Sequence, residues 1–383
     1  METVLLYVLG IVVVAVGLAI SIGLHELGHL IPAKRFGVKV GQYMIGFGPT
    51  LFSRKRGETE YGVKLIPLGG YISMAGMYPP AREGGGARTA STGFLDTLVQ
   101  DAREQSAETI TPGDEDRVFY KLPVWKRIII MLGGPFMNLL IAIVLYAVVL
   151  CGFGVYQYST TLGVVNECVA TDAAQTECTA SDPEAPAAAA GIKPGDRLVS
   201  IGGEAITSWE QASDIIRANP GTELAVVVER DGERLTLEMT PLLTERTVYD
   251  ENGQAVTDAD GDVVTEEVGF VGVSPATERA QQPVTAVLPA VWDNSVAVGK
   301  IIVTLPQRLV QVAQAAFGGD DRDPNGPISV VGVGRLAGEI TALDEAPVAD
   351  RAASLIQMLA ALNVALFVFN LIPLLPLDGG PVA

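Results

Sequence analysis

Residues 4–30 read VLLYVLGIVVVAVGLAISIGLHELGHL. The run Val4–Leu24 carries no charge, and about 20 apolar residues are enough for a helix to cross a bilayer. A secretory signal would have a basic segment before this run and a small-residue cleavage site after it. Neither is present, so we interpret the run as a retained membrane span. Two histidines and a glutamate follow it directly, and ionisable side chains at such a depth are costly unless they serve a function.

Two further runs are long enough to span a membrane. They are Ile128–Leu150 and Leu355–Leu377, and both lack charged residues. The alternative for each run is a buried core helix, but core helices rarely continue this far without a charge. The chain is 49% hydrophobic and only 18% charged, which is also unusual for a soluble protein. We therefore predict a multi-pass α-helical membrane protein with three spans in the cell membrane.

The distribution of basic residues predicts the orientation of these spans. Residues 31–127 contain 14 Lys and Arg against 10 Asp and Glu, whereas residues 152–354 contain 12 against 31. Basic loops stay in the cytoplasm. Residues 31–127 should therefore be cytoplasmic, residues 152–354 should lie outside, and the third span should run inward. The net charge of −18 argues against a nucleic-acid partner and leaves the lipid bilayer as the main surroundings.

Composition and periodicity divide the chain into seven predicted regions. These are a first membrane helix (1–31), a membrane-associated β-hairpin region (32–78), a flexible cytoplasmic linker (79–120), a second membrane helix (121–151), a small extracytoplasmic α+β domain (161–275), an amphipathic region at the membrane surface (290–345) and a third membrane helix (352–383). Within the linker we expect a short helix around Phe94–Ser106, and within the surface region an amphipathic helix at 296–317.

The extracytoplasmic domain has several local signals. Ser208 should cap a helix, and Asp231-Gly232 should form the tip of a hairpin. Residues 244–268 are rich in Asp, Glu and Thr and indicate an acidic insertion. Cys168 and Cys178 are candidates for a disulfide, since disulfides persist outside the cytoplasm, although spacing alone does not establish their geometry.

The stretch HELGH at 25–29 carries the chemistry. His25 and His29 are four residues apart, so on a helix they lie on one face and can reach one metal ion. Glu26 points about 100° around the helix and can reach a water on that metal. This H-E-x-x-H arrangement is typical of a zinc site with Glu as general base. The alternative is a pair of histidines hydrogen-bonded within a helix bundle, which would leave the burial of a carboxylate beside them without a partner cation.

A catalytic zinc ion needs a third protein ligand and an open position. His25 and His29 are the only histidines, and Cys151 lies at the far end of the second span. Among the carboxylates, Asp378 alone sits at the end of a span, and both this end and the histidines should lie near the cytoplasmic side. The alternative role for Asp378 is a turn residue before Gly379. Pro373 and Pro376 favour the ligand role, because they open the helix where a side chain must reach inward.

With these motifs in view, the chain resembles the intramembrane zinc metalloproteases of the site-two protease family, in the bacterial RseP-like branch with a PDZ domain. The resemblance covers nearly the whole chain. The stretches that carry it are HELGH (25–29), GFGP (46–49), YGVKLIPLGGYISMAGM (61–77), GGPFMN (133–138), NLIPLLPLDGG (370–380) and the PDZ-like part of the outer domain. Family members have a further span after the last of these motifs, and the present sequence stops at Ala383.

The resemblance implies roles for individual residues. His25, His29 and Asp378 would bind Zn²⁺, Glu26 would be the base, and Asn370 and Asn138 would hold substrate or shape the site. The hairpin region would hold the substrate as an added strand. Substrates would be single-span membrane proteins already trimmed outside, such as anti-sigma factors, and the PDZ-like domain would act as a size filter.

Two hypotheses from other classes compete with the protease. One is a non-catalytic membrane scaffold that binds C-termini through its PDZ-like domain; the presence of Glu26 argues against it, because a scaffold does not need a base. The other is a zinc transporter or sensor, which we would expect to have more ligands along several spans than two histidines. Stoichiometric zinc without cleavage of any membrane substrate would favour either of them.

Overall fold

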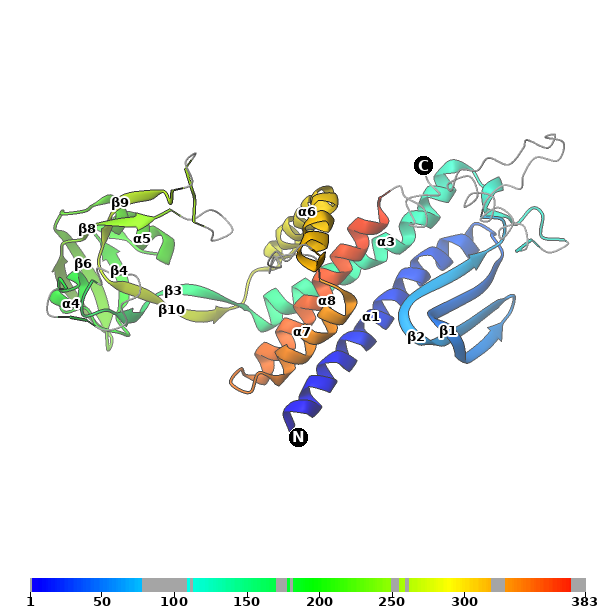
Figure 1. Ribbon diagram of the computed structural model, residues 1–383, viewed down its shortest axis with the longest axis horizontal. Coiled ribbons are helices and arrows are strands. Elements are labelled where there is room, and N and C mark those ends of the chain that lie inside the picture. The colour runs from blue at the N-terminus through cyan, green and yellow to red at the C-terminus, as the bar shows by residue number, and fades with distance from the viewer. Residues whose placement is uncertain are drawn as a thin grey trace. The chain divides into compact units, whose positions relative to one another are not determined.

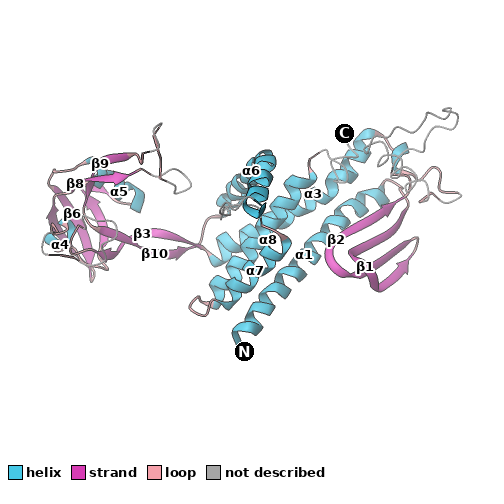
Figure 2. Ribbon diagram, viewed as in Figure 1, coloured by secondary structure: helices cyan, strands magenta, loops and turns pink. Residues whose placement is uncertain are grey.

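The structure is a computed structural model that describes residues 2–77, 109–110, 113–169, 178–179, 182–248, 255–258, 262–317 and 328–372. The chain divides into two compact units. The first, here called the membrane unit, contains residues 1–154 and 281–383, and the second, the small unit, contains residues 155–280. Their elements are labelled in Figure 1 and coloured by type in Figure 2.

The membrane unit is built from long helices and one antiparallel sheet. Its helical elements are α1 (Glu2–Arg35), the 3₁₀ turn η1 (Phe119–Lys121), α3 (Val124–Ala147), the π-helical turn η2 (Val148–Phe153), the 3₁₀ turn η3 (Val284–Ala286), α6 (Val287–Phe317), α7 (Val330–Ala342) and α8 (Val348–Asn370). At 1.5 Å per residue α1 is about 51 Å long, well beyond the roughly 30 Å of a bilayer core. It ends with Lys34 and Arg35, where basic side chains favour a helix C-terminus.

Among the described residues, four helices are long and apolar enough to cross a membrane, one more than the three predicted spans. They are Thr3–Arg35, Val124–Phe153, Val284–Val312 and Val348–Asn370. The additional one contains α6, whose apolar sequence is interrupted by Asp293, Lys300 and Arg308. Figure 1 shows α6 nearly end-on, while α1, α3 and α8 run side by side across the view. Because α6 runs across the direction of α1, α3 and α8, the amphipathic surface helix predicted at 296–317 stays a prediction.

The third predicted span is shifted in the structure. Helix α8 covers Val348–Asn370 rather than 355–377, so it begins earlier and includes Asp350 and Arg351. Asn363 of α8 lies beside Ser21 of α1, and Leu359 lies beside Gly17. The contacts advance along both helices together, so α8 runs parallel to α1. This agrees with the predicted inward direction of the third span relative to the first.

The predicted hairpin region forms strands β1 (Val40–Arg56) and β2 (Thr59–Met74), which are antiparallel. Both strands bend, so residues 42–45 pair with 60–63 on one side and with 70–73 on the other, while 50–56 pair with 59–64. The sheet therefore has four segments in the order 50–56, 59–66, 40–47 and 70–74. Gly46 allows the bend, because its φ of +93° suits glycine and a side chain there would meet the Ile66 carbonyl.

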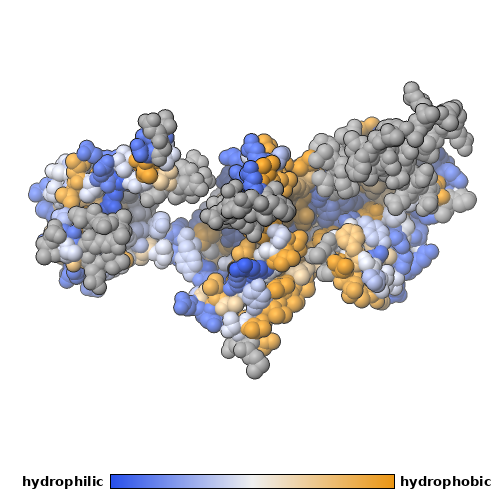
Figure 3. Space-filling model, in the orientation of Figure 1, coloured by the Kyte–Doolittle hydropathy of each residue, from blue (hydrophilic) through white to orange (hydrophobic). Residues whose placement is uncertain are grey.

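The bent end of this sheet exposes apolar side chains. Phe47, Leu51, Phe52, Leu65 and Ile66 are all exposed. Figure 3 shows apolar surface over part of this sheet and over helix α1. An exposed patch of this kind suits contact with lipid or with a partner, and the membrane association of the hairpin region stays a prediction.

The small unit is an α+β unit around one apolar core. Its elements are β3 (Val155–Val165), α4 (Pro186–Ala189), β4 (Arg197–Ile201), β5 (Glu204–Ala205), α5 (Trp209–Ala218), β6 (Leu224–Arg230), β7 (Glu233–Met239), β8 (Leu242–Thr247), β9 (Thr265–Phe270) and β10 (Val273–Ala280). The main sheet has the order β10-β3-β4-β6-β7, and β8 pairs with β9. The small unit covers residues 155–280, which is more than the predicted 161–275, because β3 and β10 pair from Val155 to Val165.

Local predictions for the small unit are confirmed. The Ser208 side chain caps α5 by accepting a hydrogen bond from the Gln211 N–H. Asp231 and Gly232 form the turn between β6 and β7. Cys168 and Cys178 form a disulfide. The acidic insertion also contains regular structure, since β8 and β9 pair from Leu242–Phe270 to Thr247–Thr265.

Some predicted features lie outside the described residues. The short helix around Phe94–Ser106 is one of them, and residues 373–383, which include Asp378, are another.

Candidate active site

Helix α1 continues without a break through the HELGH motif, as predicted. His25, Glu26 and His29 are all buried, with exposed fractions of 8%, 9% and 4%. The Nε2 atoms of the two histidines lie 3.2 Å apart. Two nitrogen ligands, each about 2.0–2.1 Å from one tetrahedral zinc ion, would be roughly 3.3 Å apart. The spacing of the histidines therefore fits a shared metal ion.

Helix α3 holds His29 in the orientation that such a site needs. The Nδ1–H of His29 donates a hydrogen bond to the Ile130 carbonyl, with a distance of 2.7 Å. A proton on Nδ1 leaves the Nε2 lone pair available, and Nε2 is the atom that faces His25. A carbonyl partner of this kind is typical of histidines that bind metals.

Asn138 of α3 lies against the other histidine. Its Nδ2 atom is 3.0 Å from His25 Nδ1, and the side chain is completely buried. Within the described part of the chain its Oδ1 atom has no hydrogen-bond partner. The family resemblance implies that Asn138 holds substrate or shapes the site, and the structure places its amide within hydrogen-bond distance of His25.

Glycines allow α1 and α3 to approach closely at the motif. A Cβ atom on Gly28 would lie 2.2 Å from the Gly133 carbonyl oxygen, and one on Gly133 would lie 2.1 Å from that of Gly28. A Cβ on Gly134 would lie 2.2 Å from His29 Nε2 and 2.7 Å from His25 Nε2. Sequence reasoning quoted Gly133 and Gly134 as part of a motif but missed this role. The available signal was a pair of small residues inside a membrane helix, which favours close packing.

The β1–β2 sheet lies on another side of the same motif. A Cβ on Gly70 would lie 2.8 Å from Ile22 Cγ2 and 3.0 Å from Glu26 Cγ. The Tyr43 hydroxyl donates to the Gly23 carbonyl oxygen at 2.6 Å. Burial, together with the charge of Glu26, raises the pKa of Tyr43 to about 12, so the hydroxyl keeps its proton. The sheet edge at residues 70–74 is thereby held beside Glu26.

A second buried polar pair lies one helical turn before His25. Asn363 of α8 donates to Ser21 Oγ at 3.0 Å and to the Leu359 carbonyl at 2.8 Å. Ser21, His25 and His29 lie on one face of α1, because they are spaced by four residues. Asn370 is the last residue of α8, two turns beyond Asn363, and is half-buried. Sequence reasoning missed Ser21 and Asn363, since a single Ser or Asn in a span gives no pattern.

Among the described residues, no group of three His, Cys, Asp or Glu side chains could hold a metal ion. The predicted third ligand, Asp378, lies outside them. The residues that are described supply two converging imidazoles and a carboxylate within one helical turn, which is the donor and base set of a zinc hydrolase.

Comparisons with known proteins agree with this chemistry. The model of peptidase family M50 matches residues 13–383. The zinc metalloprotease Rip1 of Mycobacterium tuberculosis is 36% identical over 389 residues, covering 99% of this chain and 85% of that protein. The metalloprotease MmpA of Caulobacter vibrioides is 30% identical over 371 residues, covering 95% and 82%. The chain therefore belongs to peptidase family M50, the site-2 proteases, and is a zinc metalloprotease of the membrane.

Proposed function

We propose that this protease cleaves single-span membrane proteins within their transmembrane segments, as a step of regulated intramembrane proteolysis. Its substrates would be proteins already trimmed outside the membrane, such as anti-sigma factors. The observation that carries the proposal is the buried cluster of His25, Glu26 and His29 at the end of a membrane-length apolar run in α1. A zinc site in that position acts on peptide bonds that lie at the depth of the bilayer.

His25 and His29 would hold the zinc ion together with Asp378. The bound ion supplies Lewis-acid chemistry for peptide hydrolysis. Glu26 would take the proton of the attacking water and pass it to the leaving amine, which is the usual work of a general base that later acts as an acid. The close contact of Glu26 with the sheet at Gly70 would leave it beside the scissile bond.

Asn138 would orient His25. With Nδ2 of Asn138 facing His25 Nδ1, the imidazole proton would lie on Nε2 and block metal binding there. With the amide rotated, Oδ1 accepts a hydrogen bond from Nδ1–H, and the Nε2 lone pair faces that of His29. The same rotation gives the otherwise unpartnered Oδ1 a donor.

The substrate would bind as an extra strand on the β1–β2 sheet. A helical substrate hides its carbonyls in its own hydrogen bonds, so it must be unwound before cleavage. The 70–74 segment lies at one edge of the sheet and next to Glu26, so an added strand there would run past the base. Asn370, at the end of α8, would help to hold this extended segment.

The small unit would be a PDZ-like domain outside the membrane, acting as a size filter on substrates. Its apolar core and its capped helix α5 fit a compact α+β domain. Its Cys168–Cys178 disulfide supports the placement outside, because disulfides persist in oxidising compartments. The catalytic motif would lie toward the cytoplasm.

Cysteine labelling tests this orientation. In a protein with Cys151 replaced by Ala, Lys55→Cys in the exposed part of β1 should react with an impermeant thiol reagent only from the cytoplasmic side. Ser274→Cys, exposed in β10, should react only from the outside. Reaction of both from the same side would contradict the proposed orientation.

Asp378 variants test the ligand set. Asp378→Ala should lower both zinc content and cleavage sharply, because two histidines leave zinc under-coordinated. Asp378→Asn should be nearly as damaging, since a neutral amide oxygen is a poor zinc ligand, whereas Asp378→Glu should retain part of the metal. Asp344→Ala, in the exposed turn before α8, is the matched control and should keep full zinc. Metal analysis of the purified variants decides the question, and wild-type zinc in Asp378→Ala would mean that another residue is the third ligand.

The substrate class is tested in cells that carry Glu26→Gln in place of the wild type. Quantitative proteomics of their membranes should find single-span proteins that are trimmed outside but intact within the membrane. The same proteins should appear cut within their spans when the wild type is restored. If the accumulating proteins are soluble or multi-span, or if none accumulates, the proposed substrate class is wrong.

A further inference from the structure

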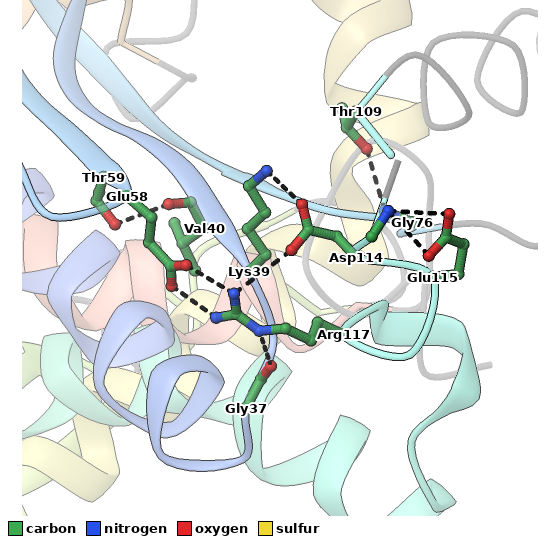
Figure 4. Close-up of polar contacts among 11 residues, drawn as sticks. Gly37, Lys39, Val40, Glu58, Thr59, Gly76, Thr109, Asp114, Glu115 and Arg117 are labelled. Atoms are coloured by element: carbon green, nitrogen blue, oxygen red, sulfur yellow. Dashed lines mark hydrogen bonds and ion pairs between the residues drawn. The ribbon is translucent and has the colours of Figure 1, made fainter. Parts of the chain in front are cut away.

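The segment before α3 contacts the end of the β1–β2 sheet that carries Lys39 and Glu58, as Figure 4 shows for Asp114 and Arg117. The Phe119 N–H donates to the Ala75 carbonyl at 2.9 Å, and the Tyr120 N–H donates to that of Gly76 at 3.0 Å. The Lys39 N–H donates to the Arg117 carbonyl at 3.0 Å. Phe119 is buried, so this segment is part of the packed structure rather than a loose entry into the helix.

The Arg117 guanidinium connects three parts of the membrane unit (Figure 4). Its two terminal nitrogens each lie 2.7 Å from one oxygen of the Glu58 carboxylate, in the turn between β1 and β2. Its Nε–H donates to the Gly37 carbonyl, just beyond α1, at 3.3 Å. A bidentate pair of this kind fixes direction as well as distance.

The surrounding charges keep this connection ionised. Hydrogen bonding from Arg117 holds the pKa of the Glu58 carboxyl below its usual value. Asp114 accepts from Lys39 Nζ at 2.6 Å and lies 3.5 Å from Arg117 Nη1. Two cations and two carboxylates therefore alternate across the end of the sheet, from the turn at Glu58 to the start of β1.

These ion pairs connect opposite sides of the β1–β2 sheet. The sheet segments lie in the order 50–56, 59–66, 40–47 and 70–74. Arg117 belongs to a segment that is hydrogen-bonded to the sheet edge at Ala75 and Gly76. Its side chain reaches Glu58, in the hairpin on the other side of the sheet. It therefore spans the sheet end crosswise, while the edge at Gly70 contacts Ile22 and Glu26.

We propose that Arg117, through Glu58, is a positioning residue that sets the place of the 70–74 edge relative to Glu26. An exposed ion pair adds little to global stability, and its value here lies in geometry. Without it, the outer hairpin at 50–66 is held to the rest of the sheet only by its pairing with 40–47, and a shift of that hairpin passes through 40–47 to the 70–74 edge. The positioning role itself does not depend on the proposed function. Only the expected effect on cleavage rests on the strand addition proposed there.

The test measures the edge position directly. In a protein with Cys151→Ala, the pair Ile22→Cys and Gly70→Cys should oxidise rapidly to a disulfide. Ile22 and Gly70 are in contact, and the change of Ile22 to the smaller Cys makes room for the Gly70 side chain, whose Cβ would otherwise lie 2.8 Å from Ile22 Cγ2. Adding Arg117→Gln or Glu58→Gln should slow oxidation at least fivefold. The two changes together should slow it no more than either alone, since both remove the same contact. Lys121→Gln, which breaks the neighbouring exposed pair with Asp116, is the matched control and should leave the rate unchanged.

Zinc content checks that each variant is folded, and Arg117→Lys replaces Arg117→Gln if the latter fails to fold. An unchanged oxidation rate in Arg117→Gln, or additive effects in the double variant, would overturn the proposal. Cleavage by the single variants, measured without the added cysteines, should fall in step with oxidation. If oxidation slows while cleavage stays at the wild-type level, the positioning role stands and the strand addition of the proposed function is wrong.

Discussion

Glu26→Gln is expected to abolish measurable cleavage while leaving zinc content and fold unchanged. Glutamine has the same shape but cannot accept the proton of the attacking water. Loss of a general base typically costs about 10²–10⁴ in rate, and the cost is greater where that base also activates the nucleophile. Glu26 is buried, with 9% of the residue's surface exposed, so solvent is a poor substitute for its carboxylate. Cleavage of a reconstituted membrane substrate and metal analysis of the same sample measure both quantities.

A second glutamate supplies the control for this change. Glu339 lies on α7 and pairs with Arg335 at the surface. Glu339→Gln should therefore cleave at the wild-type rate. If Glu26→Gln retains activity within a few-fold of wild type, Glu26 is not the base. If Glu26→Gln loses zinc as well as activity, Glu26 has a structural or metal-binding role. The assignment of Glu26 as a base distinct from the metal ligands then fails.

Features that depend on neighbouring residues in the chain were predictable from the sequence. His25 and His29 fall on one face because helix geometry alone sets their spacing. The cap at Ser208 and the turn at Asp231-Gly232 likewise follow from local backbone preferences, and the structure confirms them. Strong local signals suffice where a single periodicity or turn type determines the result.

Features that depend on tertiary contact were not predictable. Asn138 and His25 are 113 residues apart in the chain, and only the close packing of α1 on α3 brings them to 3.0 Å. The bends that make two strands into four sheet segments depend on Gly46 and on the facing strand. Helix α6 was not recognised as a candidate span because Asp293, Lys300 and Arg308 interrupt its apolar sequence, although its length and composition suit a membrane.

The bounds of α8 differ from those that hydropathy alone predicts. The uncharged run 355–377 suggested that the helix begins at its first apolar residue. The helix instead begins at Val348, with Pro347 in the N-cap position, and Asp350 lies in its first turn, where an acidic side chain favours a helix start. It ends at Asn370, ahead of Pro373. Charge and proline therefore determine the ends of this helix, whereas hydropathy determines only its middle.

Gly134→Ala is expected to abolish zinc binding and cleavage together. The added Cβ would lie 2.2 Å from His29 Nε2 and 2.7 Å from His25 Nε2, which is closer than such atoms approach. The histidines cannot easily move aside, because His29 is bonded to the Ile130 carbonyl and His25 contacts Asn138. Separation of the helices is opposed by the backbone contact between Gly28 and Gly133. We expect zinc content to fall at least tenfold, with no detectable cleavage.

The effect should be local to the metal site. Alanine favours a helix more than glycine does by about 1 kcal/mol, so α3 itself should not be weakened. The matched control is Gly152→Ala in η2, where a Cβ meets no atom of the described residues within 4 Å. That variant should bind zinc and cleave as the wild type does. Circular dichroism of Gly134→Ala should show normal helix content beside the loss of metal. Full zinc and normal cleavage in Gly134→Ala would mean that α3 does not pack against the two histidines, and the proposed roles of Asn138 and Ile130 at the site would fail with it.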